Sequence, residues 1–137
     1  MAVKIAFATS DRRAVNQHFG AAEAFAVYEL CEKEARLVEV AEFIETAMDG
    51  HEGKLAAKVD LLGDCAAVYC NAVGASAIRQ LLAKSIQPMR VEEGVLIDEL
   101  LLGLQKNLVN DPPLWLAKRL KKQSGSDKFA ADEEWQE

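Results

Sequence analysis

The N-terminal third of the chain contains three apolar segments that are typical of β-strands. Residues 3–8 are almost continuously apolar, as expected for a strand that is covered on both faces of a sheet. Residues 25–31 and 36–44 follow, and only residues 32–35, which include the polar turn 32–34, separate them. Because a connection this short joins antiparallel neighbours, we expect these two strands to form a hairpin.

After residue 50 the apolar residues recur with the period of an α-helix. Leu55, Val59 and Leu62 form one stripe, and Gly63 is the kind of residue that commonly ends a helix. A second amphipathic pattern follows Gly74 and predicts another helix. The chain therefore changes from strand pairs to helical connections at this point.

Two short strands alternate with these helices. Residues 66–70 form an apolar run of strand length. Residues 86–91 form another, in which Pro88 cannot donate a hydrogen bond and therefore favours an edge or a bulge. The strongest helical pattern spans residues 96–108 and is interrupted by a Pro-Pro pair, after which residues 114–122 form a short amphipathic segment.

The resulting order of elements, βββαβαβα, predicts an α/β fold. Hairpin-linked strands joined to right-handed crossovers give a mixed five-stranded sheet with helices on both faces. We expect residues 1–122 to form one domain. Residues 123–137 contain a Ser-Gly-Ser sequence and an acidic stretch, which predicts a flexible tail.

Composition narrows the class of protein without identifying it. The chain has 137 residues, half of them apolar, which suits one globular domain. It has no apolar run long enough to span a membrane, no recognisable signal peptide and three cysteines. We therefore expect a cytoplasmic monomer without a disulfide framework.

The charge of the chain also excludes one class of partner. The net charge is −6, which argues against general nucleic-acid binding because phosphate contacts need a surplus of Lys and Arg. Residues 123–137 carry five acids and one base, a charge of −4, which leaves −2 on the remainder. A body with so small a charge is compatible with a local basic patch that attracts an anionic ligand.

The loop after the first strand, residues 9–20, contains the most suggestive side chain. His18 lies in it, and loops at strand ends are where α/β folds place their ligands. Imidazole is also a suitable ligand for iron and molybdenum centres. Judged from the residues alone, a surface or structural histidine is the more common interpretation. Arg12 and Arg13 in the same loop would favour an anionic ligand.

Other residues offer less chemistry. Cys70 ends a predicted strand, where a thiolate could bind a cluster iron, although a small buried side chain is the more common role of such a cysteine. His51 is not part of an H-E-x-x-H motif, because Leu55 stands where the second histidine is needed. The chain has no P-loop and no G-x-S-x-G elbow, and its first strand lacks the carboxylates of a nuclease. We therefore expect that the protein is not an enzyme.

Residues 11–25, which contain V-N-Q-H-F-G, resemble the signature loop of the dinitrogenase iron–molybdenum cofactor-binding family, a group of nitrogenase accessory factors. The similarity continues at residues 52–56, 70–77, 87–88 and 111–116, so it covers nearly the whole body of the chain. The resemblance implies a ribonuclease H-like fold used without nuclease chemistry. It also implies binding of the iron–molybdenum cofactor, an Fe–Mo–S cluster with homocitrate, or of its iron–sulfur precursor.

The same resemblance maps the family's ligand histidine onto His18. The other cofactor-binding residues that we expect are Arg12, Arg13, Asn16, Gln17, Phe19 and Gly20 of the loop, with Cys70 as a weaker second candidate. The implied role is to carry or insert the cofactor during dinitrogenase maturation, with apo-dinitrogenase and other cofactor-assembly proteins as partners. The alternative is an interaction module that stabilises cofactor-free dinitrogenase, with the Trp115 segment and the acidic tail as docking surfaces.

Overall fold

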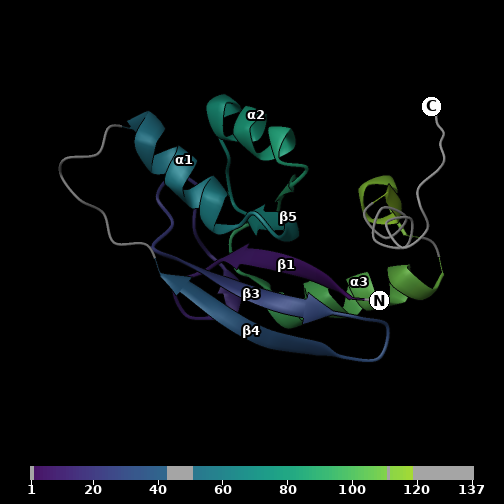
Figure 1. Ribbon diagram of the computed structural model, residues 1–137. Helices are drawn as coiled ribbons and strands as arrows, with labels where there is room; N and C mark the ends of the chain where they lie inside the picture. The colour runs from purple at the N-terminus through teal and green to yellow at the C-terminus, as the bar shows by residue number, and fades with distance from the viewer. Residues whose placement is uncertain (1, 43–50, 111, 119–137) are drawn as a thin grey trace, which may run out of the picture.

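A five-stranded sheet forms the centre of the molecule. The computed structural model describes residues 2–42, 51–110 and 112–118 (Figure 1). The strands lie in the order β4-β3-β1-β5-β6. Their bounds are β1 (Val3–Ala8), β3 (Ala24–Leu30), β4 (Ala35–Glu42), β5 (Cys65–Cys70) and β6 (Gln87–Arg90). β3 pairs antiparallel with both β1 and β4, whereas β5 pairs parallel with β1 and β6.

Helices cover both faces of this sheet. α1 (His51–Leu61) and α2 (Ala75–Ala83) lie side by side over one face (Figure 1). α3 (Ile97–Val109) packs on the other face, and residues 114–118 form a short helical segment after it. Two further strands, β2 (Ala14–Val15) and β7 (Val95–Leu96), pair antiparallel as a separate two-stranded sheet.

The predicted mixed five-stranded sheet with helices on both faces is confirmed. The observed order of elements also contains β2 and β7, which the predicted order lacks. A strand of two residues is too short to show an alternating pattern, so the sequence carried no signal for either. The predicted helix at residue 96 was wrong by one residue, because Leu96 belongs to β7. Residues 43–44 of the predicted third strand and the tail at 123–137 lie outside the described residues.

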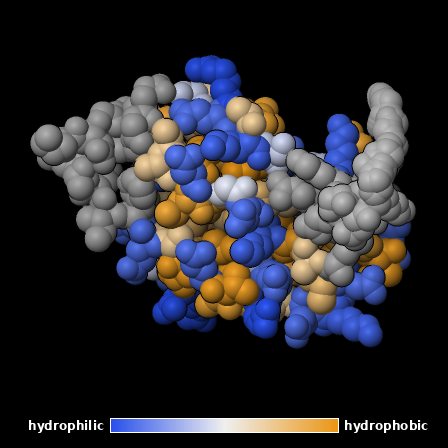
Figure 2. All heavy atoms as spheres, viewed as in Figure 1, coloured by the Kyte–Doolittle hydropathy of each residue, from blue (hydrophilic) through white to orange (hydrophobic). Residues whose placement is uncertain are grey.

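Alternation along the strands divides the core into two clusters. Ala6 and Ala8 of β1 face α1 and α2, whereas Ile5 and Phe7 face α3. All four side chains are buried, which explains why residues 3–8 are apolar at nearly every position. At the molecular surface, apolar side chains form several separate patches between polar ones on the face shown in Figure 2.

Both edges of the sheet carry features that discourage pairing with another chain. β6 is short and contains Pro88, and the predicted edge position of this proline is confirmed. β4, at the opposite edge, shifts register against β3 next to Val27, so that Val38 is left without a partner. A bulge of this kind bends an edge strand away from a regular ladder.

Candidate functional site

Three loops meet at one edge of the sheet. Because β1, β5 and β6 are parallel, the loops after their carboxyl ends lie at the same edge. These loops contain residues 9–13, 71–74 and 91–94. The first of them continues through β2 to residue 20, and we refer to residues 9–20 as the His18 loop.

The beginning of the His18 loop is shaped by its own side chains. The buried Thr9 hydroxyl donates to Asp11 Oδ1 over 3.1 Å and accepts a hydrogen bond from Arg12 N over 3.0 Å. Asp11 Oδ1 also accepts hydrogen bonds from Arg13 N (2.9 Å) and Ala14 N (3.1 Å). The backbone hydrogen bonds from Arg13 and Ala14 hold the pKa of the Asp11 carboxyl below its usual value. These bonds hold Arg12 in the left-handed region, with φ 62°.

The amides of Asn16 and Gln17 are also used inside the loop. Asn16 Oδ1 accepts a hydrogen bond from Ser10 N (3.0 Å), and its Nδ2 donates to Ser10 Oγ (3.1 Å). Gln17 Oε1 accepts one from Glu23 N over 2.9 Å. Both side chains therefore help to fix the shape of the loop.

His18 lies between two backbone hydrogen bonds to the β5–α2 connection. Asn71 N donates to Gln17 O (3.0 Å) on one side of His18, and Phe19 N donates to Ala72 O (2.8 Å) on the other. The backbone at His18 is therefore held against the end of β5. Its side chain is exposed and available to a ligand.

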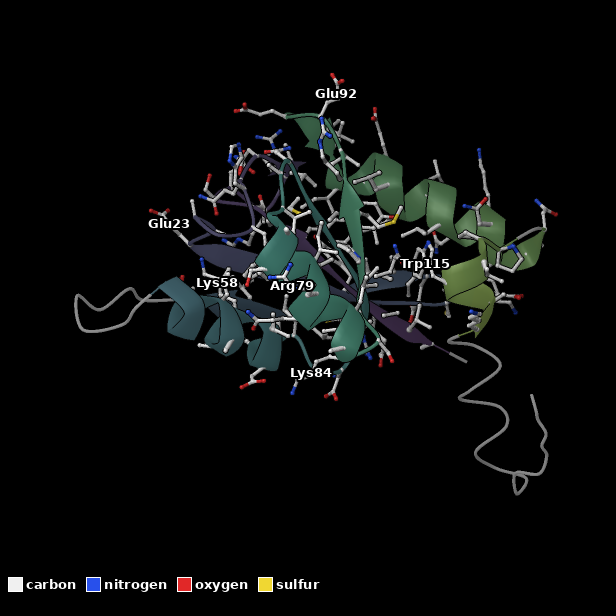
Figure 3. All side chains as sticks on the ribbon, turned by 90° about the horizontal axis from the view of Figure 1, so that it is seen from above. Glu23, Lys58, Arg79, Lys84, Glu92 and Trp115 are labelled. Carbon is white, nitrogen blue, oxygen red and sulfur yellow. The ribbon has the colours of Figure 1, made fainter. Side chains whose placement is uncertain are left out.

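The far end of the loop is anchored in the core. The Phe19 ring is fully buried against Phe25, with ring centroids 5.5 Å apart. Lys58 of α1 is only 1% exposed, and its Nζ donates to Phe19 O (3.3 Å) and Gly20 O (2.6 Å) (Figure 3). A buried ammonium group needs such acceptors, because removing it from water is otherwise costly.

Two depressions share His18 as a lining residue. We call the first, of about 530 Å³, the site cavity. It is lined by His18, Gly20, Ala21, Leu55, Ala72, Val73, Gly74, Ala75, Ser76 and Ala77. We call the second, of about 430 Å³, the polar depression; it is lined by His18, Asn71, Arg90, Val91, Glu92 and Glu93. His18 is therefore the side chain that connects an apolar hollow with a charged one.

The N-terminus of α2 opens onto the site cavity. Gly74 is its N-cap residue, no side chain caps this end, and the first turn contains no acidic residue. The first turn, residues 75–77, lines the cavity. The backbone amides at the beginning of a helix favour a negatively charged group nearby. The small side chains of this wall leave space beside His18.

The structure does not bring every predicted residue to these depressions. Arg12 and Arg13 are exposed and line neither of them. Cys70 is fully buried and also lines neither. Burial raises the pKa of the Cys70 thiol to about 11, so this thiol is protonated near neutral pH. Gly20 lines the site cavity, whereas the Phe19 ring is buried in the core and lines neither depression.

Three residues of the site were missed by the sequence reasoning. They are Lys58, Asn71 and Arg90. Asn71 and Arg90 lie at the carboxyl ends of predicted strands, and this position could have marked them as candidates. Lys58 stands on the helical stripe beside Val59, and no local pattern distinguishes it from an exposed lysine.

The described residues contain no group of three or more His, Cys, Asp and Glu side chains that could hold a metal ion. Within the same residues, none of the helices is long and apolar enough to cross a membrane.

Comparisons with known proteins show which family the chain resembles. The sequence matches the family described as dinitrogenase iron-molybdenum cofactor over residues 1–107. It is 50% identical over 125 residues to the protein NifX of Azotobacter vinelandii, covering 91% of this chain and 79% of that protein. It is 33% identical over 114 residues to the FeMo cofactor biosynthesis protein NifB of Frankia alni, covering 80% of this chain and 22% of that protein.

A solved structure supports the fold separately. The crystal structure of PH0822 is similar to this chain with a TM-score of 0.58, covering 82% of this chain and 97% of that chain. The sequence identity is 19%, so the likeness concerns the fold alone.

Proposed function

This chain belongs to the dinitrogenase iron–molybdenum cofactor family, and we propose that its site cavity binds the iron–molybdenum cofactor or its iron–sulfur precursor as cargo, with His18 as a metal ligand. The family and the NifX and NifB relatives connect the chain with nitrogen fixation, iron–molybdenum cofactor biosynthesis and nitrogenase maturation. The observation that carries the proposal is an exposed imidazole on a clamped backbone, at the junction of two depressions.

The chemistry of the site suits a carrier. A neutral imidazole is a good ligand for iron and molybdenum, and a single protein ligand can be replaced when the cargo is handed on. A closed set of four ligands would instead hold the metal as part of the fold. The small side chains around the cavity leave room for a cluster, and the first turn of α2 favours negative charge there. We therefore propose carriage or insertion during dinitrogenase maturation, without enzymatic turnover.

The fold is also suited to this role. The order and directions of the five strands agree with those of a ribonuclease H-like fold, which we propose for this chain. In such a sheet the parallel strands end at one edge, and the His18 loop is found at that edge. The inward-facing carboxylates of a nuclease are absent from β1, whose six residues are all uncharged except Lys4.

Anaerobic titration of isolated iron–molybdenum cofactor tests the ligand assignment. We expect His18→Ala to weaken cofactor binding by about 10- to 100-fold or more, because a direct ligand matters at least as much as its supporting residues. Its free energy of unfolding should stay within about 0.5 kcal/mol of the wild type, because His18 is exposed. The matched control is His51→Ala, which removes the only other histidine of the chain. Equal affinity of wild type and His18→Ala would contradict the assignment.

The alternative role, an interaction module that stabilises cofactor-free dinitrogenase, has its own candidate surface. A groove of about 290 Å³ lies beside β6 and the 114–118 segment. It is lined by Ala66, Leu82, Ser85, Ile86, Gln87, Trp115 and Lys118. Leu82 is 52% exposed, and Leu114, which precedes Trp115 in the sequence, is 71% exposed. In Figure 3, Trp115 and Lys58 lie on opposite sides of α2, so this groove is separate from the His18 loop.

The two roles predict different results in one paired experiment. If the wild type binds cofactor and Leu82→Asp does so equally well, the groove is not needed for the cargo. If the wild type does not bind cofactor but captures apo-dinitrogenase, and Leu82→Asp loses this capture, the interaction module is the better description. A carrier that also docks would show both activities, each lost in a different variant.

A further inference from the structure

We infer that Asn71 is a positioning residue for His18, because its side-chain and backbone N–H groups join the His18 loop to the loop after β6. The role in cargo binding rests on the function proposed above. The positioning itself is a property of the protein without cargo, and it can be tested without any ligand.

Asn71 makes three hydrogen bonds to segments that are distant in the sequence. Its backbone N donates to Gln17 O over 3.0 Å. Its side-chain Nδ2 donates to Val15 O over 3.0 Å and to Val91 O over 3.2 Å. Asn71 therefore holds the residues on the N-terminal side of His18 and, with the same amide group, the segment that follows β6.

The two carbonyls that accept from the Asn71 side chain belong to residues with further backbone hydrogen bonds. Val91 N donates to Cys70 O over 2.9 Å, so Val91 is held to the end of β5 by both of its backbone polar groups. Val15 O accepts a second hydrogen bond from Gly94 N, also over 3.0 Å. The His18 loop and the segment after β6 are thus both hydrogen-bonded to the Asn71 side chain at the end of β5, and Asn71 lines the polar depression.

The side chain required at this position is specific. Two carbonyl oxygens must each accept a hydrogen bond from one short side chain, and the NH₂ group of asparagine supplies two N–H donors. A carboxylate of the same size has no donor and would repel both oxygens. Alanine would remove both bonds but would leave the backbone bond to Gln17 O. The Ala variant should therefore still fold, because Val15 O keeps its bond from Gly94 N.

The first test uses cargo-free protein and NMR. We expect Asn71→Ala to shift and broaden the imidazole signals of His18, which are assigned with His18→Ala. We also expect hydrogen exchange at Phe19 N, the donor to Ala72 O, to become at least about tenfold faster, and faster still in Asn71→Asp.

The control is Ser10→Ala, which removes the bond that Ser10 Oγ accepts from Asn16 Nδ2 in the same loop and leaves the Asn71 bonds in place. Its Phe19 exchange should stay within about twofold of the wild type. Unchanged His18 signals and Phe19 exchange in both Asn71 variants would overturn the inference. An equal effect of Ser10→Ala would also overturn it, because any loosening of the loop would then suffice.

The second test measures coupling during cargo binding, again by anaerobic titration of isolated cofactor. If Asn71 acts through His18, Asn71→Ala should weaken binding about 3- to 10-fold in the wild type and have no further effect in a His18→Ala background. The same loss in both backgrounds would contradict positioning through His18. If wild type and His18→Ala bind equally, the proposed function fails, and the cargo-free measurement still decides the role of Asn71.

Discussion

The two faces of the sheet are covered in different ways. On the α3 face, aromatic residues of the strands pack on one another: Phe7 stacks on Tyr69 with centroids 5.2 Å apart and meets Tyr28 edge-on at 5.7 Å. On the α1–α2 face, a large aromatic residue comes from a loop instead, since Phe19 packs against Phe25. The loop that presents His18 is therefore also a part of the core on that face.

The buried polar side chains are both associated with the His18 loop. Thr9 and Lys58 are the two polar side chains that are buried in the described part of the chain; Thr9 belongs to the His18 loop, and Lys58 of α1 donates to its carbonyls. The comparison teaches that the loop is anchored on the two faces in different ways: next to His18 by the Phe19 ring on the α1–α2 face, and further from His18 by Val15 and the Ile97 N–Arg13 O hydrogen bond on the α3 face.

Truncating one aromatic residue on each face should have the largest effect. We expect Phe19→Ala and Phe7→Ala each to lower the free energy of unfolding by about 4 kcal/mol, because both rings are fully buried. Urea unfolding measures this loss. Only Phe19→Ala should also change the NMR signals of His18. Phe19→Leu and Phe7→Leu serve as milder variants. Equal changes in the His18 signals of the Phe19 and Phe7 variants would contradict the difference between the two faces.

Removing the buried ammonium group should have a smaller effect, again confined to the loop face. Lys58→Met removes the ammonium donor from the carbonyls of Phe19 and Gly20 and leaves the Phe19 carbonyl only its bond from Ala22 N, so we expect a loss of about 3 kcal/mol in urea unfolding. The control is Lys84→Met, which removes an exposed ion pair of 3.1 Å with Asp60 and should cost below about 0.5 kcal/mol. Similar losses in the two variants would show that burial of Lys58 is unimportant.

Alkaline pH should separate the two faces by a further, smaller effect. Burial raises the pKa of Cys70, on the loop face, to about 11 and that of Tyr69, on the α3 face, to about 12. Both values lie above those of the unfolded chain, 9.0 and 10.0. The Cys70 contribution is therefore complete below pH 9 and is lost as pH rises through about 11, a loss of roughly 2 kcal/mol.

Urea unfolding between about pH 8 and pH 11 measures this loss. Cys70→Ala should flatten the pH dependence between pH 9 and about 11, although it lowers stability at neutral pH. Tyr69→Phe should keep this decline and reduce the one that begins near pH 10. A Cys70→Ala variant with the same pH dependence as the wild type would contradict a protonated, buried thiol.

Much of the fold was predictable because its main elements repeat a pattern over several residues. The apolar run of β1, the β3–β4 hairpin and the stripe of Leu55, Val59 and Leu62 all reflect burial on a face of a strand or helix. β2 and β7 were missed because each contributes only two residues to a ladder. The edge position of β6 was predictable for a separate reason, the missing N–H group of Pro88.

For the candidate site, the sequence determined which loop to examine, through the resemblance around His18. The side-chain bonds of Asn16 and Gln17 join residues that are close in the sequence, within or next to this loop. The tertiary structure alone decided what holds that loop. Lys58 reaches carbonyls 38 and 39 residues away, and Asn71 reaches one that is 56 residues away. Periodic patterns report how a residue relates to its near neighbours. Hydrogen bonds between distant segments depend on which segments the tertiary fold brings together, and no local pattern contains that information.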